Sequence, residues 1–242
     1  MFAIQTVNLT KNYKDTIAVD HLNLKIGQGE LVCLLGVNGA GKTTTIKMLS
    51  CLTRPTSGEA FLHGNSICKD RTAVKSLIAV SPQETAVAPG LTVRENLALM
   101  CGIYGFSEEK RTTKITELTA LLGLNAVMGK KAGKLSGGWQ RRLSIAMALI
   151  SEPQILFLDE PTLGLDVIAR SELWDLIRSL KGQTTIILTT HYMEEAETLS
   201  DRIAIMKAGK LLLCDTAEAI RTATKADTFE QAFIRIVKEG AI

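Results

Sequence analysis

Gly36-Val37-Asn38-Gly39-Ala40-Gly41-Lys42-Thr43 is a glycine-rich loop that directly follows the apolar residues Leu31–Leu35 and precedes a helical stretch, residues 44–49. It matches the pattern G-x-x-x-x-G-K-[ST] in the strand, loop and helix setting of a phosphate-binding loop. The glycines let successive backbone N–H groups turn inward around phosphate oxygens, at the positive end of the following helix. The loop therefore predicts a nucleotide-binding α/β fold rather than a fortuitous glycine-rich turn.

Two side chains of the loop carry its chemistry. Lys42 can reach the β- and γ-phosphates of a nucleotide, and the Thr43 hydroxyl can ligate Mg²⁺. We expect the nucleotide contacts in this part of the chain to come from Gly36, Asn38, Gly39, Ala40, Gly41, Lys42, Thr43 and Thr44.

Further apolar runs resemble the one before the loop. Residues 155–158 and 185–188 are short, and each lies beside a polar or glycine-containing turn. Such runs are typical of strands buried on both faces of a sheet, and helical stretches separate them here. We therefore predict an α/β fold, a P-loop NTPase core with a mainly parallel sheet, whose ligands gather at the carboxyl ends of the strands.

Two segments depart from this alternation. Residues 4–9 and 16–26, separated by the polar residues 10–15, predict an N-terminal antiparallel hairpin. Strand signals disappear over residues 89–150, where Thr92 and Glu95 form a capping-box pattern at a helix start. We expect a single domain in which residues 1–88 and 151–242 form the nucleotide-binding core, and residues 89–150 form an inserted helical subdomain.

The last part of the chain predicts a hairpin and a helix. Residues 202–206 and 211–214 flank Lys207-Ala208-Gly209-Lys210, a hairpin turn signal. Thr228 and Gln231 then cap a helix with one apolar face, for which we favour core packing over a partner-binding surface. That face consists of Phe229, Ala232, Phe233, Ile236 and Val237.

Composition excludes several classes of protein. The 242 residues are 46% hydrophobic and 22% charged, and the net charge of +3 comes from 28 basic and 25 acidic residues without a basic block. This balance gives no case for nucleic acid as a ligand. No apolar stretch approaches the roughly 18 to 20 residues of a membrane span, and residues 1–10 lack the order of a signal peptide, so we expect a cytosolic location.

The cysteines are odd in number, widely spaced and never arranged as C-x-x-C. We interpret them as buried thiols rather than a metal or redox site. They are Cys33, Cys51, Cys68, Cys101 and Cys214.

Two adjacent carboxylates, Asp159 and Glu160, end the apolar run at residues 155–158. Side chains alternate along a strand, so these two should point in different directions. One can then hold Mg²⁺ through water while the other faces the attacking water. A strand that simply ends in acids is the plain alternative, but the phosphate loop favours the chemical interpretation.

A second glycine-rich turn, Leu135-Ser136-Gly137-Gly138-Trp139-Gln140-Arg141-Arg142, leads into an amphipathic helix. Ser136 can either cap that helix or donate to a phosphate, and the glycines admit a close backbone approach. Two phosphate-type loops in one chain suggest that each serves a different nucleotide in a dimer.

This turn resembles the signature motif of ABC-family ATPases, and it lies between the Walker A loop and the Walker B strand in the family's order. The resemblance implies that Tyr13 stacks on adenine, that Gln83 touches Mg²⁺ and the attacking water, and that His191 contacts the γ-phosphate. Without it, these residues would be interpreted as a surface tyrosine, a loop glutamine and a structural histidine. Leu163-Gly164-Leu165-Asp166 resembles the D-loop, which passes between two subunits.

The resemblance also implies a mechanism. Two ATP molecules lie head to tail between two subunits, each held by Lys42 and Thr43 of one subunit and by the signature loop of the other. Glu160 is then the general base, His191 and Gln83 orient the γ-phosphate and water, and Asp159 positions Mg²⁺. The partner subunit's share of the nucleotide site would come from Ser136, Gly137, Gly138 and Asp166.

Two departures from the family pattern concern the subclass. Trp139 stands where many members have Gln, and Leu163-Gly164-Leu165 replaces Ser-Ala-Leu. Residues 89–97, Gly164-Leu165-Asp166 and residues 189–197 resemble the ABC-2 exporters of drugs, lipids and polyketides. The resemblance implies an ATP-hydrolysing subunit at the cytoplasmic face of the membrane. Its expected partners are a separately encoded membrane-spanning permease and a second copy or a paralogue.

Two other classes are less favoured. Soluble ABC ATPases that act on ribosomes or DNA usually carry two cassettes or long coiled-coil arms, for which this chain has no room. A GTPase or small-molecule kinase would leave the signature loop unexplained, and the sequence has no Asn-Lys-x-Asp motif. The transported substrate cannot be inferred from these residues.

Overall fold

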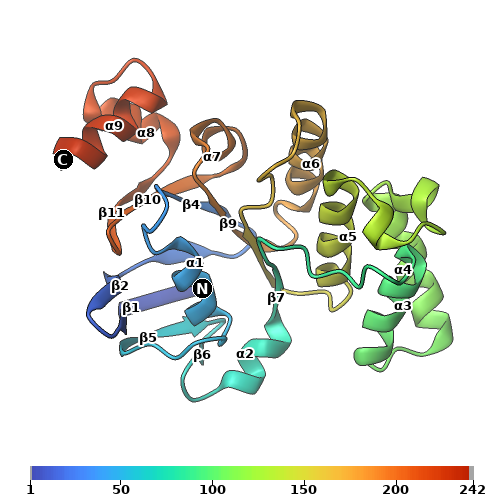
Figure 1. The fold of residues 1–242 in the computed structure, drawn as a ribbon. Helices are drawn as coiled ribbons and strands as arrows, with labels where there is room; N and C mark the ends of the chain where they lie inside the picture. The colour runs from blue at the N-terminus through green and yellow to red at the C-terminus, as the bar shows by residue number, and fades with distance from the viewer. Residues whose placement is uncertain (1, 240–242) are drawn as a thin grey trace.

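The computed structural model describes residues 2–239. Its centre is a six-stranded sheet in the order β11-β10-β4-β9-β8-β7 (Figure 1). All neighbouring pairs from β10 to β7 are parallel, and β11 pairs with β10 antiparallel. The expected mainly parallel sheet is thereby confirmed. Its strands are β4 (Leu31–Leu35), β7 (Ile78–Ser81), β8 (Ile155–Asp159), β9 (Thr185–Thr190), β10 (Arg202–Lys207) and β11 (Lys210–Asp215).

The sheet separates two apolar cores. In β4, Leu31, Cys33 and Leu35 belong to one core, and the alternate residues Val32 and Leu34 belong to the other. This follows from the period of two in a strand, and it explains why the run is apolar without alternation. Strands β4, β8 and β9 are buried along their whole length.

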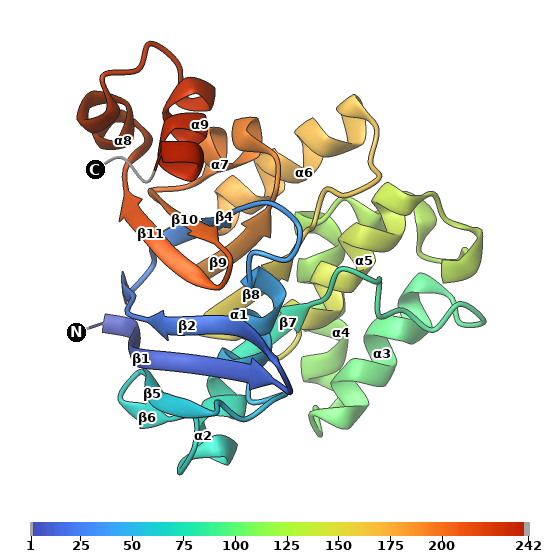
Figure 2. The same ribbon diagram turned by 60° about the vertical axis from the view of Figure 1, so that its left-hand side comes forward.

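The second sheet is antiparallel, with the order β2-β1-β5-β6 and with β3 paired to β1. In Figure 2 it forms a layer below the parallel sheet, with helix α1 between them. It consists of β1 (Phe2–Tyr13), β2 (Thr16–Leu22), β3 (Lys25–Gly27), β5 (Ser57–Leu62) and β6 (Asn65–Ser66). The N-terminal hairpin is therefore confirmed as β1 and β2.

The hairpin's predicted boundaries were wrong in two places. Residues 10–13 continue β1 instead of forming a turn, because Thr10 pairs with Ser57 of β5 and its hydroxyl accepts a hydrogen bond from His21 N. Residues 16–26 are also not one strand. The chain breaks before β3, where Leu24 N donates to the Thr6 hydroxyl.

The helices pack on the two sheets and against one another. They are α1 (Lys42–Leu49), α2 (Arg71–Leu77), α3 (Val93–Ile103), α4 (Glu108–Leu121), α5 (Gly137–Leu149), α6 (Val167–Leu180), α7 (Met193–Leu199), α8 (Ala217–Thr224) and α9 (Phe229–Glu239). Helices α3, α4 and α5 lie together at one side of the molecule (Figures 1 and 2). They come from residues 89–150, and the division of the chain into a core and a helical subdomain remains our prediction.

Two local predictions for helices are confirmed. Glu95 N donates to the Thr92 hydroxyl, and Thr92 N donates to the Glu95 carboxylate, which completes the capping box of α3. In α9, Phe229 and Ile236 are only 2% and 3% exposed. The apolar face of this helix therefore packs in the core. The predicted hairpin is also confirmed, as the antiparallel pair β10 and β11.

The cysteines follow the prediction in part. All five are free thiols, and Cys33, Cys51 and Cys101 are buried, but Cys68 and Cys214 are only partly buried. Burial nevertheless raises the pKa of Cys214 to about 11. Within residues 2–239, no helix combines the length and the apolar character that crossing a membrane requires.

Candidate active site

A cavity of about 520 Å³ opens at the carboxyl ends of β4, β8 and β9. One wall is the phosphate loop, residues 38–44, and another is formed by Thr16, Ile17 and Ala18 of β2. The remaining lining residues are Gln83, Glu160, Leu163 and His191. The cavity thus lies where ligands are expected in a parallel sheet.

The phosphate loop is held tightly on both sides. Gly41 has φ +103° immediately before α1, and a Cβ there would lie 2.5 Å from the carbonyl oxygen of Ala18. A Cβ at Gly36 would lie 2.4 Å from the carbonyl oxygen of Met206. Only glycine fits at these two positions, so β2 and β10 fix the course of the loop.

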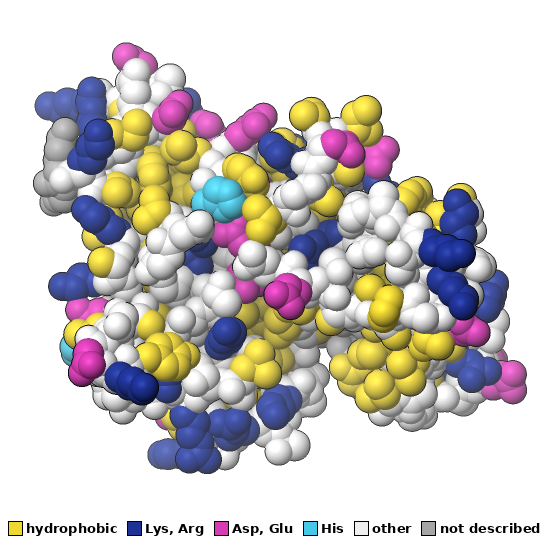
Figure 3. Space-filling view, in the orientation of Figure 1, with side chains coloured by type: hydrophobic (Ala, Val, Ile, Leu, Met, Phe, Trp, Pro, Cys, Tyr) yellow, Lys and Arg dark blue, Asp and Glu magenta, His cyan; other side chains and the backbone are white. Residues whose placement is uncertain are grey.

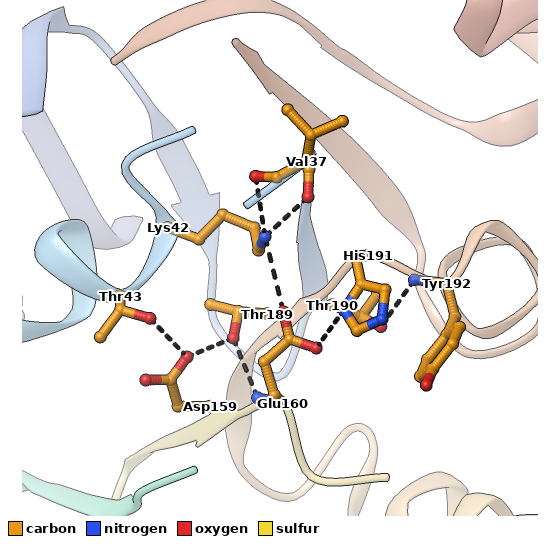
Figure 4. A network of polar contacts seen from close by, with 10 residues as sticks. Val37, Lys42, Thr43, Asp159, Glu160, Thr189, Thr190, His191 and Tyr192 are labelled. Atoms are coloured by element: carbon orange, nitrogen blue, oxygen red, sulfur yellow. Dashed lines mark hydrogen bonds and ion pairs between the residues drawn. The ribbon is translucent and has the colours of Figure 1, made fainter. Parts of the chain in front are cut away.

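Lys42 points back across the loop. Its side chain is 6% exposed, and Nζ donates a 2.6 Å hydrogen bond to the carbonyl oxygen of Gly36 (Figure 4). The same ammonium lies 3.5 Å from Glu160 Oε1. A buried positive charge therefore stands between the loop and the acid that follows β8.

Asp159 and Glu160 have different partners, as the alternation along a strand predicts. Asp159 Oδ1 accepts hydrogen bonds from the hydroxyls of Thr43, at 3.1 Å, and Thr189, at 2.5 Å. Glu160 Oε2 lies 2.8 Å from His191 Nδ1 (Figure 4). One carboxylate thus faces the phosphate loop, and the other faces the segment after β9.

The backbone at Glu160 is held in an unusual conformation. Its φ is +48°, which costs a non-glycine residue about 1 to 3 kcal/mol. Glu160 N donates to the Thr189 carbonyl at 3.1 Å and to the Thr189 hydroxyl at 3.0 Å. Thr189 was not predicted as a site residue, although two threonines that end an apolar strand before a histidine are a usable signal.

The oxygen donors at the loop fit Mg²⁺. The Thr43 hydroxyl and the Asp159 carboxylate are hard ligands that already lie side by side, and Gln83 lines the same cavity. Within residues 2–239, no three His, Cys, Asp or Glu side chains cluster as a metal site. This donor set suits an ion that takes its remaining ligands from phosphate oxygens and water.

Gln83 is held in place by Arg141 of α5. The guanidinium donates 2.6 Å hydrogen bonds to the carbonyl oxygens of Pro82 and Gln83. Burial lowers the pKa of Arg141, and the negative charge of Asp159 opposes that effect. Arg141 lies in the signature stretch but was not predicted as a site residue.

Some predicted site residues lie outside this cavity. Tyr13 is 44% exposed, with the Lys11 ammonium 5.0 Å from its ring centroid, and it is not a lining residue. Ser136 precedes α5, and its side chain makes no capping hydrogen bond, so capping, one of our two interpretations, is not observed. Asp166 caps α6 by accepting a hydrogen bond from Ala169 N.

The signature loop instead packs beside the segment that resembles the D-loop. A Cβ at Gly137 would lie 3.7 Å from the Leu165 side chain, and one at Gly138 would lie 3.1 Å from Ala169 Cβ. The backbone of this loop therefore lies close to the start of α6, and it is not a wall of the nucleotide cavity of its own chain.

The phosphate loop lies at the carboxyl end of a parallel strand, and its buried lysine faces a glutamate and histidine pair. This arrangement defines a P-loop nucleotide hydrolase. Residues 19–163 match the family model for the ABC transporter. The chain belongs to the ABC transporter family and is an ATPase cassette of that family.

Comparison with known proteins agrees with this assignment. The chain is 42% identical over 204 residues to human phospholipid-transporting ATPase ABCA3, covering 84% of this chain but only 12% of that protein. It is 40% identical over 221 residues to the daunorubicin/doxorubicin resistance ATP-binding protein DrrA of Streptomyces peucetius, covering 91% and 67% of the two chains. A solved dimeric structure of the ATP-binding cassette MJ0796, bound to ADP and Pi, superposes with a TM-score of 0.79 and 29% identity, covering 88% of this chain and 98% of that chain.

Proposed function

We propose that this cassette powers export through a separately encoded membrane-spanning subunit, at the cytoplasmic face of the membrane. The observation that supports its ATPase role is the contact between His191 and Glu160, both of which line the cavity. Glu160 Oε1 also lies 3.5 Å from the ammonium of Lys42. Export is supported by the likeness to DrrA, whose name describes drug resistance.

In the proposed reaction, Glu160 is the general base. Its Oε2 is held by His191 Nδ1, and its backbone is held by Thr189, so the carboxylate is positioned before ATP binds. Glu160 accepts the proton of the water that attacks the γ-phosphorus, and the bond to the β-γ bridging oxygen breaks. A preorganised base of this kind contributes about 10²- to 10⁴-fold to the rate.

Two cations would balance the negative charge of the phosphates. The Lys42 ammonium, which lies over the loop, can bind the β- and γ-phosphates as a charge-assisted donor. Mg²⁺, held by Thr43 and Asp159 with Gln83 nearby, would neutralise phosphate charge during the transfer. Gln83 can also orient the attacking water, because Arg141 fixes its backbone at the cavity.

A second subunit would complete the site. Ser136, Gly137, Gly138 and Asp166 do not line the nucleotide cavity of their own chain. This supports a head-to-tail dimer in which they serve the partner's nucleotide, and the solved MJ0796 cassette is itself dimeric. The second subunit is a copy of this chain or a paralogue.

The proposed contact with the permease lies on the helical side of the molecule, around residues 83–97. Hydrophobic side chains gather over that side of the face shown in Figure 3. Leu99 and Ile103 of α3, and Tyr104 directly after it, are exposed large hydrophobic residues.

Phosphate release from ATP and from GTP, with and without Mg²⁺, tests this function. We expect Mg²⁺-dependent ATP hydrolysis that Glu160→Gln abolishes, whereas Glu194→Gln, an exposed acid nearby, leaves it unchanged. Preferential GTP hydrolysis would contradict the proposal. Coexpression with a candidate membrane subunit should place the chain in the membrane fraction, whereas stimulation by ribosomes or DNA would support the soluble alternative.

A further inference from the structure

Glu195 is a buried acid that the proposed mechanism does not use. It lies in the first turn of α7, four residues after His191, and its side chain is 0% exposed. Burial raises the pKa of this carboxyl, Glu160 adds to the effect, and the hydroxyls of Thr190 and Thr162 and the indole of Trp174 oppose it. Burying a carboxyl group without a cationic partner costs free energy unless hydrogen bonds compensate it.

The contacts of Glu195 lie on both sides of one segment. Trp174 Nε1, in α6, donates a 3.0 Å hydrogen bond to Glu195 Oε1. Thr162 directly precedes the segment 163–166 that resembles the D-loop, and α6 directly follows it. Glu195 Oε2 and the Thr162 hydroxyl are both buried without a hydrogen-bond partner, although the hydroxyl affects the carboxyl's pKa.

A second contact connects α6 to the start of α7. The Arg170 guanidinium of α6 lies 4.9 Å from the centroid of the Tyr192 ring. That ring in turn lies 4.1 Å, centroid to centroid, from the His191 ring. Helix α6 is therefore attached to the His191 segment at two places, through Arg170 and through Trp174.

We propose that Glu195 is a positioning residue that couples segment 163–166 to the pair His191 and Glu160. A shift of that segment, or of α6 behind it, moves the start of α7 through Trp174 and Glu195. His191 lies two residues before α7, and its Nδ1 holds Glu160 Oε2. Contact of segment 163–166 with a partner subunit would thus set the alignment of the base.

The inference rests on the proposed ATPase function, and three variants test it. Glu195→Leu removes both oxygens, Glu195→Gln keeps an oxygen acceptor for Trp174, and Trp174→Phe keeps the ring but removes the indole donor. Glu194→Leu, at the exposed neighbouring position, is the matched control. The measurements are kcat and KM for ATP, ATP-binding stoichiometry by titration, and thermal unfolding.

We expect Glu195→Leu and Trp174→Phe to lower kcat about 10- to 100-fold, because small misplacements of catalytic groups have effects of this size. KM and binding stoichiometry should stay at the wild-type values, since ATP contacts are unchanged. Glu195→Gln should recover most of the lost kcat, and combining Glu195→Leu with Trp174→Phe should lower kcat no further.

Several outcomes would overturn the proposal. The first is a wild-type kcat in Glu195→Leu or in Trp174→Phe. The second is a kcat that decreases only in proportion to the fraction of protein that still binds ATP. If Glu195→Leu does not fold, Trp174→Phe and Glu195→Gln decide by the same criteria. A wild-type protein that binds ATP without hydrolysing it would instead refute the proposed function itself.

Discussion

Arg141 Nη2 lies 2.6 Å from the carbonyl oxygen of Gln83, although 58 residues separate the two in the chain. The guanidinium is 4% exposed, and its other nitrogen donates to Pro82 in the same way. Helix α5, which begins at the signature loop, therefore holds the backbone of a residue that lines the nucleotide cavity. A movement of α5 reaches Gln83 through this guanidinium.

We predict that Arg141→Met lowers the free energy of unfolding by about 3 kcal/mol, because a buried side chain loses two charge-assisted hydrogen bonds. Urea denaturation measures this change. The control is Arg142→Met, whose ion pair with the exposed Glu172 should contribute less than about 1 kcal/mol. Equal effects of the two substitutions would contradict the role of the Arg141 hydrogen bonds.

Thr189→Val should change the response to Mg²⁺. The hydroxyl of Thr189 supports Asp159 Oδ1 and Glu160 N, and loss of such a supporting partner typically costs about 10- to 100-fold in metal affinity or activity. A Mg²⁺ titration of ATP hydrolysis measures the effect. Thr185→Val, at the other end of β9, is the matched control and should leave the Mg²⁺ midpoint unchanged.

Tyr13→Ala should weaken ATP binding by about 1 to 3 kcal/mol if the ring stacks on adenine. Affinity for inorganic triphosphate should not change, because the phosphate contacts come from the loop. Calorimetric titration of both ligands checks this, with the exposed Tyr104→Ala as control. Wild-type ATP affinity in Tyr13→Ala would place the adenine elsewhere, with Ile17 of the cavity wall as the next candidate.

Glu160→Gln should retain ATP binding and lower turnover by about 10²- to 10⁴-fold. Since hydrolysis is expected to release the dimer, this variant should accumulate as an ATP-bound dimer while wild type stays mostly monomeric. Size-exclusion chromatography with light scattering measures both states, and Glu194→Gln serves as control.

Adding Ser136→Arg to Glu160→Gln should abolish that dimer, because a bulky cation at the signature loop would block the partner's γ-phosphate. The same light-scattering measurement applies. A dimer that persists in the double variant would argue against the head-to-tail arrangement, whereas an active Glu160→Gln enzyme would remove Glu160 from its role as base.

The features that could be predicted from sequence are those with local causes. The apolar runs of β4, β8 and β9 reflect burial on both faces, and the capping box of α3 depends on residues three apart. The phosphate loop is likewise a contiguous pattern, and its residues 38–44 line the cavity. Glu160 and His191, which the family resemblance indicates, line it as well.

The residues that were missed act through distant partners. Thr189 contacts Asp159 from 30 residues away, and Glu195 contacts Trp174 from 21 residues away. Their positions depend on the order of strands in the sheet, which local patterns do not encode. The end of β1 was misplaced for a similar reason, since pairing with β5 decided it.

Strand β4, whose alternate residues enter the two apolar cores, has a consequence for local opening. Neither core can loosen without exposing side chains of the strand that ends in the phosphate loop. Backbone amides of β4 should therefore exchange with solvent deuterium only when the whole domain unfolds, more slowly than amides of the half-exposed β11. The anchor of the nucleotide site should thus be among the last parts of the molecule to open.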